Sequence, residues 1–230
     1  MKLHWIQHVP FEGLGFIEDI AQMKGFDISS TRVFEPGHSF PDFEGLNLIV
    51  IMGGPMGVYD INEYPWLIKE KEFIRSAIEN KIKIIGICLG AQLIADVLGA
   101  KIKKNNEKEI GWFKIFPDKN YQGKLSGIFE AEPEVFHWHG DTFDIPYKSM
   151  LVCSSEGCTN QAFDYNGQVF GLQFHLETTK DSAKSLIENC NDEIQTTAKF
   201  IQAEKDIIGN ESKYLKINEM MKTVFERIIG

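Results

Sequence analysis

Long apolar runs are missing from this chain of 230 residues. No stretch of about 18 consecutive apolar residues occurs, so we expect no transmembrane helix. The first six residues resemble a short strand rather than the long apolar segment of a secretion signal. The sequence also lacks low-complexity linkers and internal repeats. These absences favour a globular protein without a membrane partner, and we expect a cytoplasmic location.

Cysteine and positive charge are also scarce. The four cysteines are Cys88, Cys153, Cys158 and Cys190, and in a reducing cytoplasm we expect no disulfides. Cys153 and Cys158 lack the second cysteine pair of a zinc site, so we expect them in the core or in turns. The chain has 24 Lys and Arg against 33 Asp and Glu, a net charge of -9. Such a surface repels phosphate backbones, which argues against a nucleic-acid partner.

The first half of the chain alternates strand-like and helix-like segments. Residues 46–52 are mostly Leu, Ile and Val without regular alternation of apolar and polar residues, which suits a strand buried on both faces of a parallel sheet. Gly99 follows one of the helix-like segments as a plausible C-terminal cap. We expect strands at 3–6, 31–34, 46–52 and 81–87, and helices at 13–25, 65–80 and 91–98. This order predicts parallel strands with helical crossovers.

The second half has a different pattern. Strand-like segments follow one another at 112–116, 135–139, 150–154, 161–165 and 168–174, and Asn166-Gly167 predicts a hairpin between the last two. Residues after about 178 look helical. We therefore predict a flavodoxin-like, three-layer α/β fold whose mostly parallel central sheet is flanked by helices and carries a small antiparallel extension. One domain over 1–230 is the simplest division, with an α/β core to about 180 and C-terminal helices over about 181–230.

Cys88 lies between a predicted strand and a predicted helix, and glycines stand at both of its second neighbours, Gly86 and Gly90. This is the cysteine counterpart of the G-x-S-x-G nucleophile turn. Small neighbours let such a sharp turn pack against the sheet, and the start of the following helix stabilises a thiolate. A structural cysteine buried in a tight turn is the alternative interpretation.

His175 ends an apolar strand-like segment, and Glu177 follows two residues later. In an extended backbone both side chains point to the same side. A carboxylate beside an imidazole orients it and stabilises its protonated form, so the histidine could take the thiol proton and later protonate a leaving amine. The alternative is a histidine at a strand end and a glutamate that starts a solvated helix.

Three segments together resemble the class I, triad-type glutamine amidotransferases, in particular the amidotransferase domain of GMP synthase and its stand-alone relatives. They are Gly53-Gly54-Pro55, residues 86–92 and residues 171–177, in the order that the family has. The resemblance covers about residues 1–180. It implies Cys88 as nucleophile of a γ-glutamyl thioester, His175 as acid and base, and Glu177 as third triad member.

The same resemblance implies further site residues. The amides of Gly54 and Leu89 would form the oxyanion hole, and Gln92, Gly53 and His139 would contact substrate. We expect no cofactor. His137 and His139 could suggest a metal pair, but no third ligand at useful spacing follows them, so we predict no metal and expect structural or pocket-lining roles. Glu109 lies in a segment that also resembles the family, with no role assigned.

Two enzymatic functions and one binding function remain open. The first is hydrolysis of glutamine, with ammonia passed to a separate synthetase, because no P-loop for an ATP-using step is present. The second is a stand-alone γ-glutamyl peptidase or hydrolase acting on small γ-glutamyl compounds. The third is a non-catalytic binding module on the same fold, which would be expected to lack a triad residue.

Overall fold

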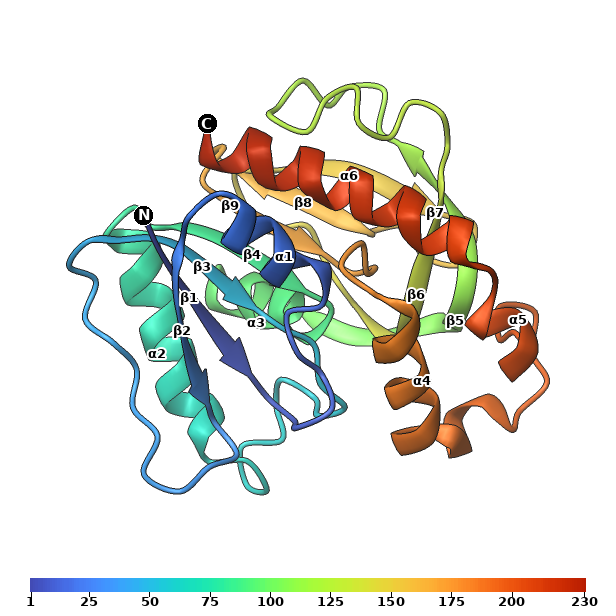
Figure 1. The fold of residues 1–230 in the computed structure, drawn as a ribbon, viewed down its shortest axis with the longest axis horizontal. Helices are drawn as coiled ribbons and strands as arrows, with labels where there is room; N and C mark the ends of the chain where they lie inside the picture. Colours follow the sequence, from blue (N-terminus) through green and yellow to red (C-terminus); the bar gives the residue numbers. More distant parts are fainter.

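The computed structural model describes residues 1–230, and its nine strands form one sheet in the order β2-β1-β3-β4-β9-β8-β7-β5-β6 (Figure 1). The strands are β1 (Lys2–Gln7), β2 (Asp27–Arg32), β3 (Leu46–Ile51), β4 (Lys83–Ile87), β5 (Ile102–Pro117), β6 (Glu134–Phe143), β7 (Ser149–Ser155), β8 (Ala162–Tyr165) and β9 (Val169–Leu172).

Helices cover both faces of the sheet. They are α1 (Phe16–Met23), α2 (Trp66–Glu79), α3 (Leu89–Val97), α4 (Lys180–Asn189), α5 (Glu204–Ile208) and α6 (Glu211–Ile229), with a short 3₁₀ helix, η1 (Asn191–Ile194). Helices α1 and α6 share one apolar core, and α2 and α3 share the other. In β3, Leu48 and Val50 face the first core while Ile49 and Ile51 face the second, which explains the four consecutive apolar residues 48–51.

The five strands β2, β1, β3, β4 and β9 are parallel to one another. Their spatial order, counted along the chain, is 2-1-3-4-5, which is the flavodoxin-like arrangement. The predicted fold class is therefore confirmed. In such sheets, ligands bind outside the carboxyl ends of the parallel strands, and the loops after β1, β3, β4 and β9 all leave the sheet at that edge.

The antiparallel extension contains β8, β7, β5 and β6. The predicted hairpin is present between β8 and β9, and Asn166 and Gly167 both have positive φ, 56° and 64°. The strand expected at 31–34 lies instead at Asp27–Arg32, where all six residues pair with β1. It is an edge strand with a mostly polar sequence, so its hydrophobic pattern carries little information about its bounds.

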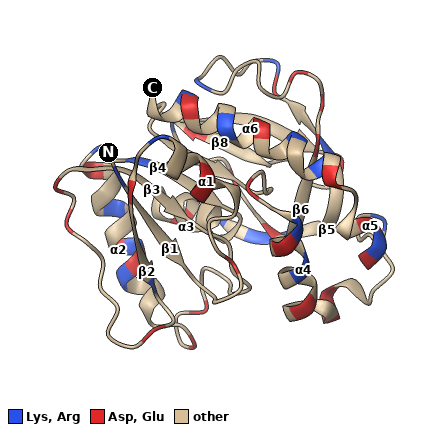
Figure 2. Cartoon of the chain, viewed as in Figure 1, with Lys and Arg blue, Asp and Glu red and all other residues tan.

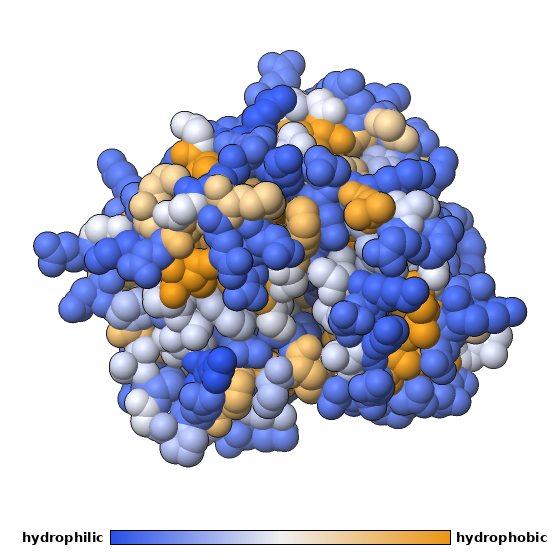
Figure 3. All heavy atoms as spheres, in the orientation of Figure 1, coloured by the Kyte–Doolittle hydropathy of each residue, from blue (hydrophilic) through white to orange (hydrophobic).

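The surface carries both signs of charge. Lys and Arg are interspersed with Asp and Glu along the helices (Figure 2), and apolar side chains on the face shown lie in separate patches among hydrophilic ones (Figure 3). None of the helices, the 19-residue α6 included, combines the length and apolar composition that crossing a bilayer requires. All four cysteines are free thiols.

Candidate active site

Cys88 occupies a strained turn between β4 and α3, with φ 51° and ψ −107°. The turn packs too closely against its surroundings for larger neighbours. A Cβ atom at Gly90 would lie 2.1 Å from the backbone oxygen of Ile51, and one at Gly86 would lie 2.6 Å from the carbonyl carbon of Gly90. The glycines on either side of the cysteine therefore allow the turn to sit on the sheet, as the sequence pattern indicated.

His175 and Glu177 form the pair that their spacing predicts. The imidazole Nδ1 lies 2.7 Å from Glu177 Oε1, and both side chains are almost fully buried. The backbone N–H of His175 donates to the carbonyl of Phe136 in β6, which fixes the histidine against the sheet. Burial alone would lower the pKa of His175, but the Glu177 carboxylate and the nearby Cys88 sulfur raise it well above its usual value.

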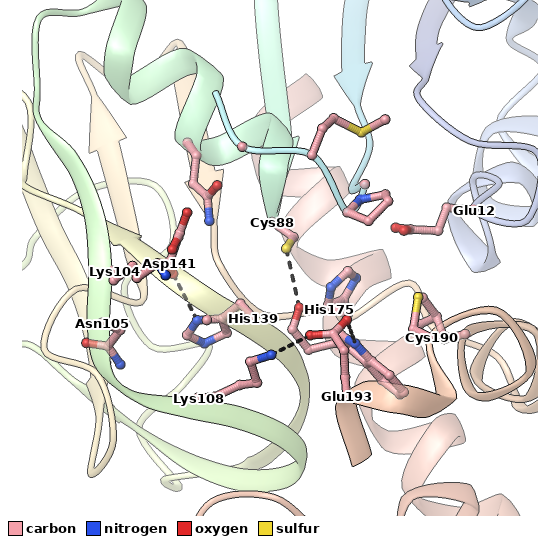
Figure 4. A pocket seen from close by; sticks show the side chains of 18 of the residues that line it. Glu12, Cys88, Lys104, Asn105, Lys108, His139, Asp141, His175, Cys190 and Glu193 are labelled. Carbon is pink, nitrogen blue, oxygen red and sulfur yellow. Dashed lines mark hydrogen bonds and ion pairs between the residues drawn. The ribbon is translucent and has the colours of Figure 1, made fainter. Parts of the chain in front are cut away.

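The thiol of Cys88 and the imidazole of His175 line one pocket (Figure 4). Cys88 Sγ lies 3.6 Å from the carbonyl oxygen of Trp138, and the Gln173 amide donates to the sulfur at 3.5 Å. Gln92 lines the pocket and donates to Gln173 at 3.1 Å. The Nε2 atom of His175 has no hydrogen-bond partner.

The two amides expected to bind an oxyanion differ in position. Gly54 lines the pocket, and its N–H makes no hydrogen bond within the protein. Leu89 is the first residue of α3, where a helix has no acceptor of its own for the N–H, and its side chain is buried. Gly53 lies beside the base, because a Cβ there would be 3.5 Å from His175 Cε1.

His139 lines the pocket and belongs to a buried polar cluster behind it. Its Nε2 lies 3.2 Å from Glu109 Oε2, and its Nδ1 lies 3.1 Å from the carbonyl of Asp141. Glu109 also accepts hydrogen bonds from Ser155 and Gln161, at 2.7 Å each. Burial would raise the pKa of this carboxyl, but the hydrogen bond from His139 and the two histidine charges hold it below its usual value.

The structure places a third possible metal ligand beside His137 and His139, which the spacing of residues in the sequence did not indicate. Glu109, His137 and His139 present possible ligand atoms within 4.8 Å of one another. The Gln161 amide nitrogen lies among them, 2.7 Å from Glu109 and 3.5 and 3.4 Å from the two imidazoles. An amide donor therefore lies in this space, and the cluster forms a buried hydrogen-bond network beside β6 in which His137 Nε2 and Gln161 Oε1 lack partners.

The pocket has a volume of about 450 Å³ and carries charges of both signs around the thiol. Glu12 and Glu193 lie on one side, and Lys104 and Lys108 approach from β5 (Figure 4). Lys108 and Glu193 form an ion pair at 2.7 Å, and the Trp138 indole also donates to Glu193, at 3.1 Å. Burial raises the pKa of Glu12.

Several of these residues were missed in the sequence. His8 and Glu12 follow the first parallel strand, and that position was a usable signal, since loops after such strands build ligand sites. Glu193 and Lys108 carry no local pattern, because only the folded chain brings η1 beside β5. Cys190 also lines the pocket, and burial raises its pKa to about 11, as expected of a thiol that stays protonated.

Fold and site together define an α/β protein with a nucleophile-type turn at the carboxyl edge of a parallel sheet. The model of the family "Glutamine amidotransferase class-I" matches residues 24–194, and the chain belongs to this family. Its general chemistry is hydrolysis of the glutamine amide.

Relatives support the same assignment. The chain is 31% identical to the glutamine amidotransferase-like protein YfeJ of Salmonella typhimurium, over 84% of this chain and 83% of that protein. It is 30% identical to the glutamine-hydrolysing GMP synthase of Borrelia garinii, covering 65% of this chain but only 27% of the synthase. A crystal structure of a glutamine amidotransferase from Thermotoga maritima matches all of this chain and 98% of its own, with a TM-score of 0.87 and 32% identity.

Proposed function

We propose that the chain hydrolyses the γ-glutamyl amide of glutamine through a thioester on Cys88, with His175 as acid and base and Glu177 orienting it. One observation carries the proposal: an imidazole held by a carboxylate at 2.7 Å presents an unpartnered Nε2 in the same pocket as the thiol. The raised pKa of His175 favours the imidazolium, the form it takes once it holds the thiol proton.

The proposed steps use these groups in turn. The Sγ proton passes to His175 Nε2, and the thiolate attacks the γ-carbonyl carbon of the substrate. Amides of Gly54 and Leu89 donate to the resulting oxyanion. The imidazolium then protonates the departing amine, which leaves as ammonia, and a thioester remains. Water attacks the thioester while His175 takes one of its protons, and the thiol and glutamate are released.

Charges around the pocket suit the zwitterionic end of a γ-glutamyl substrate. Glu12 and Glu193 offer carboxylates to an α-ammonium group, while Lys104 and Lys108 offer ammonium groups to an α-carboxylate. Gln92 and His139 line the pocket beside the thiol and complete the proposed contacts, with Gly53 next to the base.

A second candidate is hydrolysis of larger γ-glutamyl amides, such as small γ-glutamyl peptides. The pocket favours it, because it extends from Cys88 to Lys104 and Asn105 on β5, beyond the space around the thiol itself. A carboxylate on a larger leaving group could pair with these side chains. The two functions share every chemical step and differ only in the amine that leaves.

An ammonia-accepting synthetase is a possible partner for the first function. Relatives named glutamine-hydrolysing GMP synthase are much longer than this chain, which spans about a quarter of their length. For the first function, we propose a synthetase as the acceptor of the ammonia. Addition of such a partner would then raise the rate of glutamine hydrolysis.

The test is a panel of glutamine, glutathione and other γ-glutamyl amides given to the wild type and to Cys88→Ala. We expect ammonia or amine release by the wild type, and no turnover by Cys88→Ala with an unchanged thermal midpoint, since the variant removes only the sulfur. Ammonia from glutamine alone would support the amidotransferase, and cleavage of larger amides would support the peptidase. Turnover by folded Cys88→Ala would contradict the mechanism, and an inactive wild type that still binds these compounds would favour the binding module.

A further inference from the structure

His8 follows the end of β1 and is enclosed on three sides. Its Nδ1 lies 2.9 Å from the carbonyl oxygen of Gly53, and its Nε2 lies 2.9 Å from Glu70 Oε1. Trp66 stacks on the ring at 5.6 Å, with 23° between the planes. Trp66 and Glu70 are four residues apart on α2 and lie on the same face of this helix. Trp66 therefore stacks on the plane of the imidazole while Glu70 bonds its edge.

Both ring nitrogens of His8 face an acceptor, a carbonyl oxygen on one side and a carboxylate on the other. The ring can satisfy both only with a proton on each nitrogen. Burial would lower the pKa of His8, but the Glu70 carboxylate, the Gly53 carbonyl and the more distant Glu12 raise it. The pair is fully buried, and Glu70 Oε2 has no partner. A buried ion pair is weak evidence for stability, so its position beside the site calls for a functional explanation.

The contact with Gly53 controls the orientation of one peptide unit. In a trans peptide the carbonyl of Gly53 and the N–H of Gly54 point in opposite directions, and this chain has no cis peptide. A carbonyl held toward His8 therefore directs the Gly54 N–H away from His8. Gly54 lines the pocket with Cys88. The packing is close, because a Cβ at Gly54 would lie 2.9 Å from His8 Cβ and 3.1 Å from a Leu89 methyl carbon.

We propose that His8 and Glu70 are positioning residues that hold the Gly53–Gly54 peptide with its N–H aimed at the oxyanion. The inference rests on the proposed hydrolysis and adds the groups that preorganise its oxyanion hole. A donor fixed before the reaction costs no reorganisation when negative charge develops. The protonated ring also withdraws electron density through the carbonyl, which makes the Gly54 N–H a stronger donor.

The test replaces both members of the pair, because removing one alone would leave a buried charge unpaired. We expect His8→Leu/Glu70→Met to fold and to lose about 10²-fold in kcat and in kcat/KM, as for the loss of one oxyanion donor, with KM unchanged. Alkylation of Cys88 by iodoacetamide forms no oxyanion, so its rate should stay at the wild-type value. Adding back a donor, in His8→Asn/Glu70→Met, should recover part of kcat.

His4→Gln is the matched control, a buried histidine of β1 whose ring nitrogens bond Ser29 and Thr31, and none of these three residues lines the pocket. It should keep the wild-type kcat. A folded double variant with wild-type kcat would overturn the proposal. A crystal structure of that variant gives a readout independent of turnover: the Gly53 carbonyl should leave its present direction, and an unchanged peptide would refute the inference even if no γ-glutamyl amide is hydrolysed. Absence of any hydrolysis by the wild type would instead contradict the proposed function.

Discussion

At the scale of single residues, Cys88 has a strained backbone conformation, and hydrogen bonds of the surrounding backbone maintain it. A non-glycine residue with φ near 50° costs about 1–3 kcal/mol. The Cys88 N–H donates to Leu172 at 2.8 Å, and the Gly90 N–H donates to Met52 at 3.1 Å. The turn is thereby tied to β9 and to the end of β3, and the sulfur is held at the sheet edge.

Glu177→Gln should slow turnover without ending it. The variant keeps a hydrogen-bond acceptor for His175 but removes the charge that raises the histidine pKa. The base itself remains in this variant. Removing general acid–base catalysis altogether lowers kcat by at least about 10²-fold, so we expect a smaller loss in kcat for Glu177→Gln. The limb of the pH–rate profile that reports the ionisation of His175 should also move to lower pH.

The matched control is Asp181→Asn, which removes an exposed carboxylate at the start of α4. It should leave both the rate and the pH profile unchanged. A Glu177→Gln variant with the wild-type pH profile would show that Glu177 does not set the protonation of His175.

At the scale of elements, α6 supports the segment that carries the base and its partner. The Asn218 amide donates to the carbonyls of Leu176 and Thr178, at 2.9 and 3.1 Å, on both sides of Glu177. Met221 and Phe225 of α6 are fully buried and belong to the apolar core that α6 shares with α1. The C-terminal helix therefore takes part in shaping the site.

Asn218→Ala should destabilise the protein by about 1–3 kcal/mol, because two buried carbonyls lose their donor. We also expect a lower kcat, since the backbone around Glu177 is no longer held. Urea unfolding and steady-state kinetics measure the two effects. Asn189→Ala, at an exposed position on α4, is the control and should change neither. If Asn218→Ala lost stability but kept full activity, α6 would have no part in positioning the residues of the site.

At the scale of the whole molecule, buried histidines respond to pH in opposite directions. Burial lowers the pKa of His4 to about 4 and that of His137 to about 3, so the folded state resists their protonation. The pKa values of His8 and His175 are raised, so their contribution is complete below pH 6.5 and is lost only as pH rises through their folded values.

The free energy of unfolding should therefore fall as the pH drops from 6.5 toward 4. In this window the unfolded chain protonates His4 and His137 while the folded chain does not. His4 alone accounts for about 3 kcal/mol at the acid end. His4→Gln should flatten the slope between pH 6.5 and 5 in urea titrations, and an unchanged slope would contradict the assignment.

Much of the fold was predictable because its pattern is local. Apolar runs flanked by glycine placed β3 and β4, and Asn166-Gly167 placed the β8–β9 hairpin. The predicted bounds of the polar edge strand β2, residues 31–34, differ from the observed ones. Pairing with β1, rather than the side chains of β2 itself, sets where this strand begins and ends. The strand expected at 112–116 is the end of the longer β5, whose polar first half pairs with β6.

The sequence by itself determined the fold class and the residues of the proposed triad, since a nucleophile turn and an H-x-E strand end each act through neighbours within a few positions. Only the tertiary structure decided which other groups surround the thiol. His8 and Glu70 are 62 residues apart, and Glu109 and Gln161 are 52 apart, yet each pair is in contact. Burial and charge act between such groups through space, so their pKa values and roles depend on distances that sequence spacing does not contain.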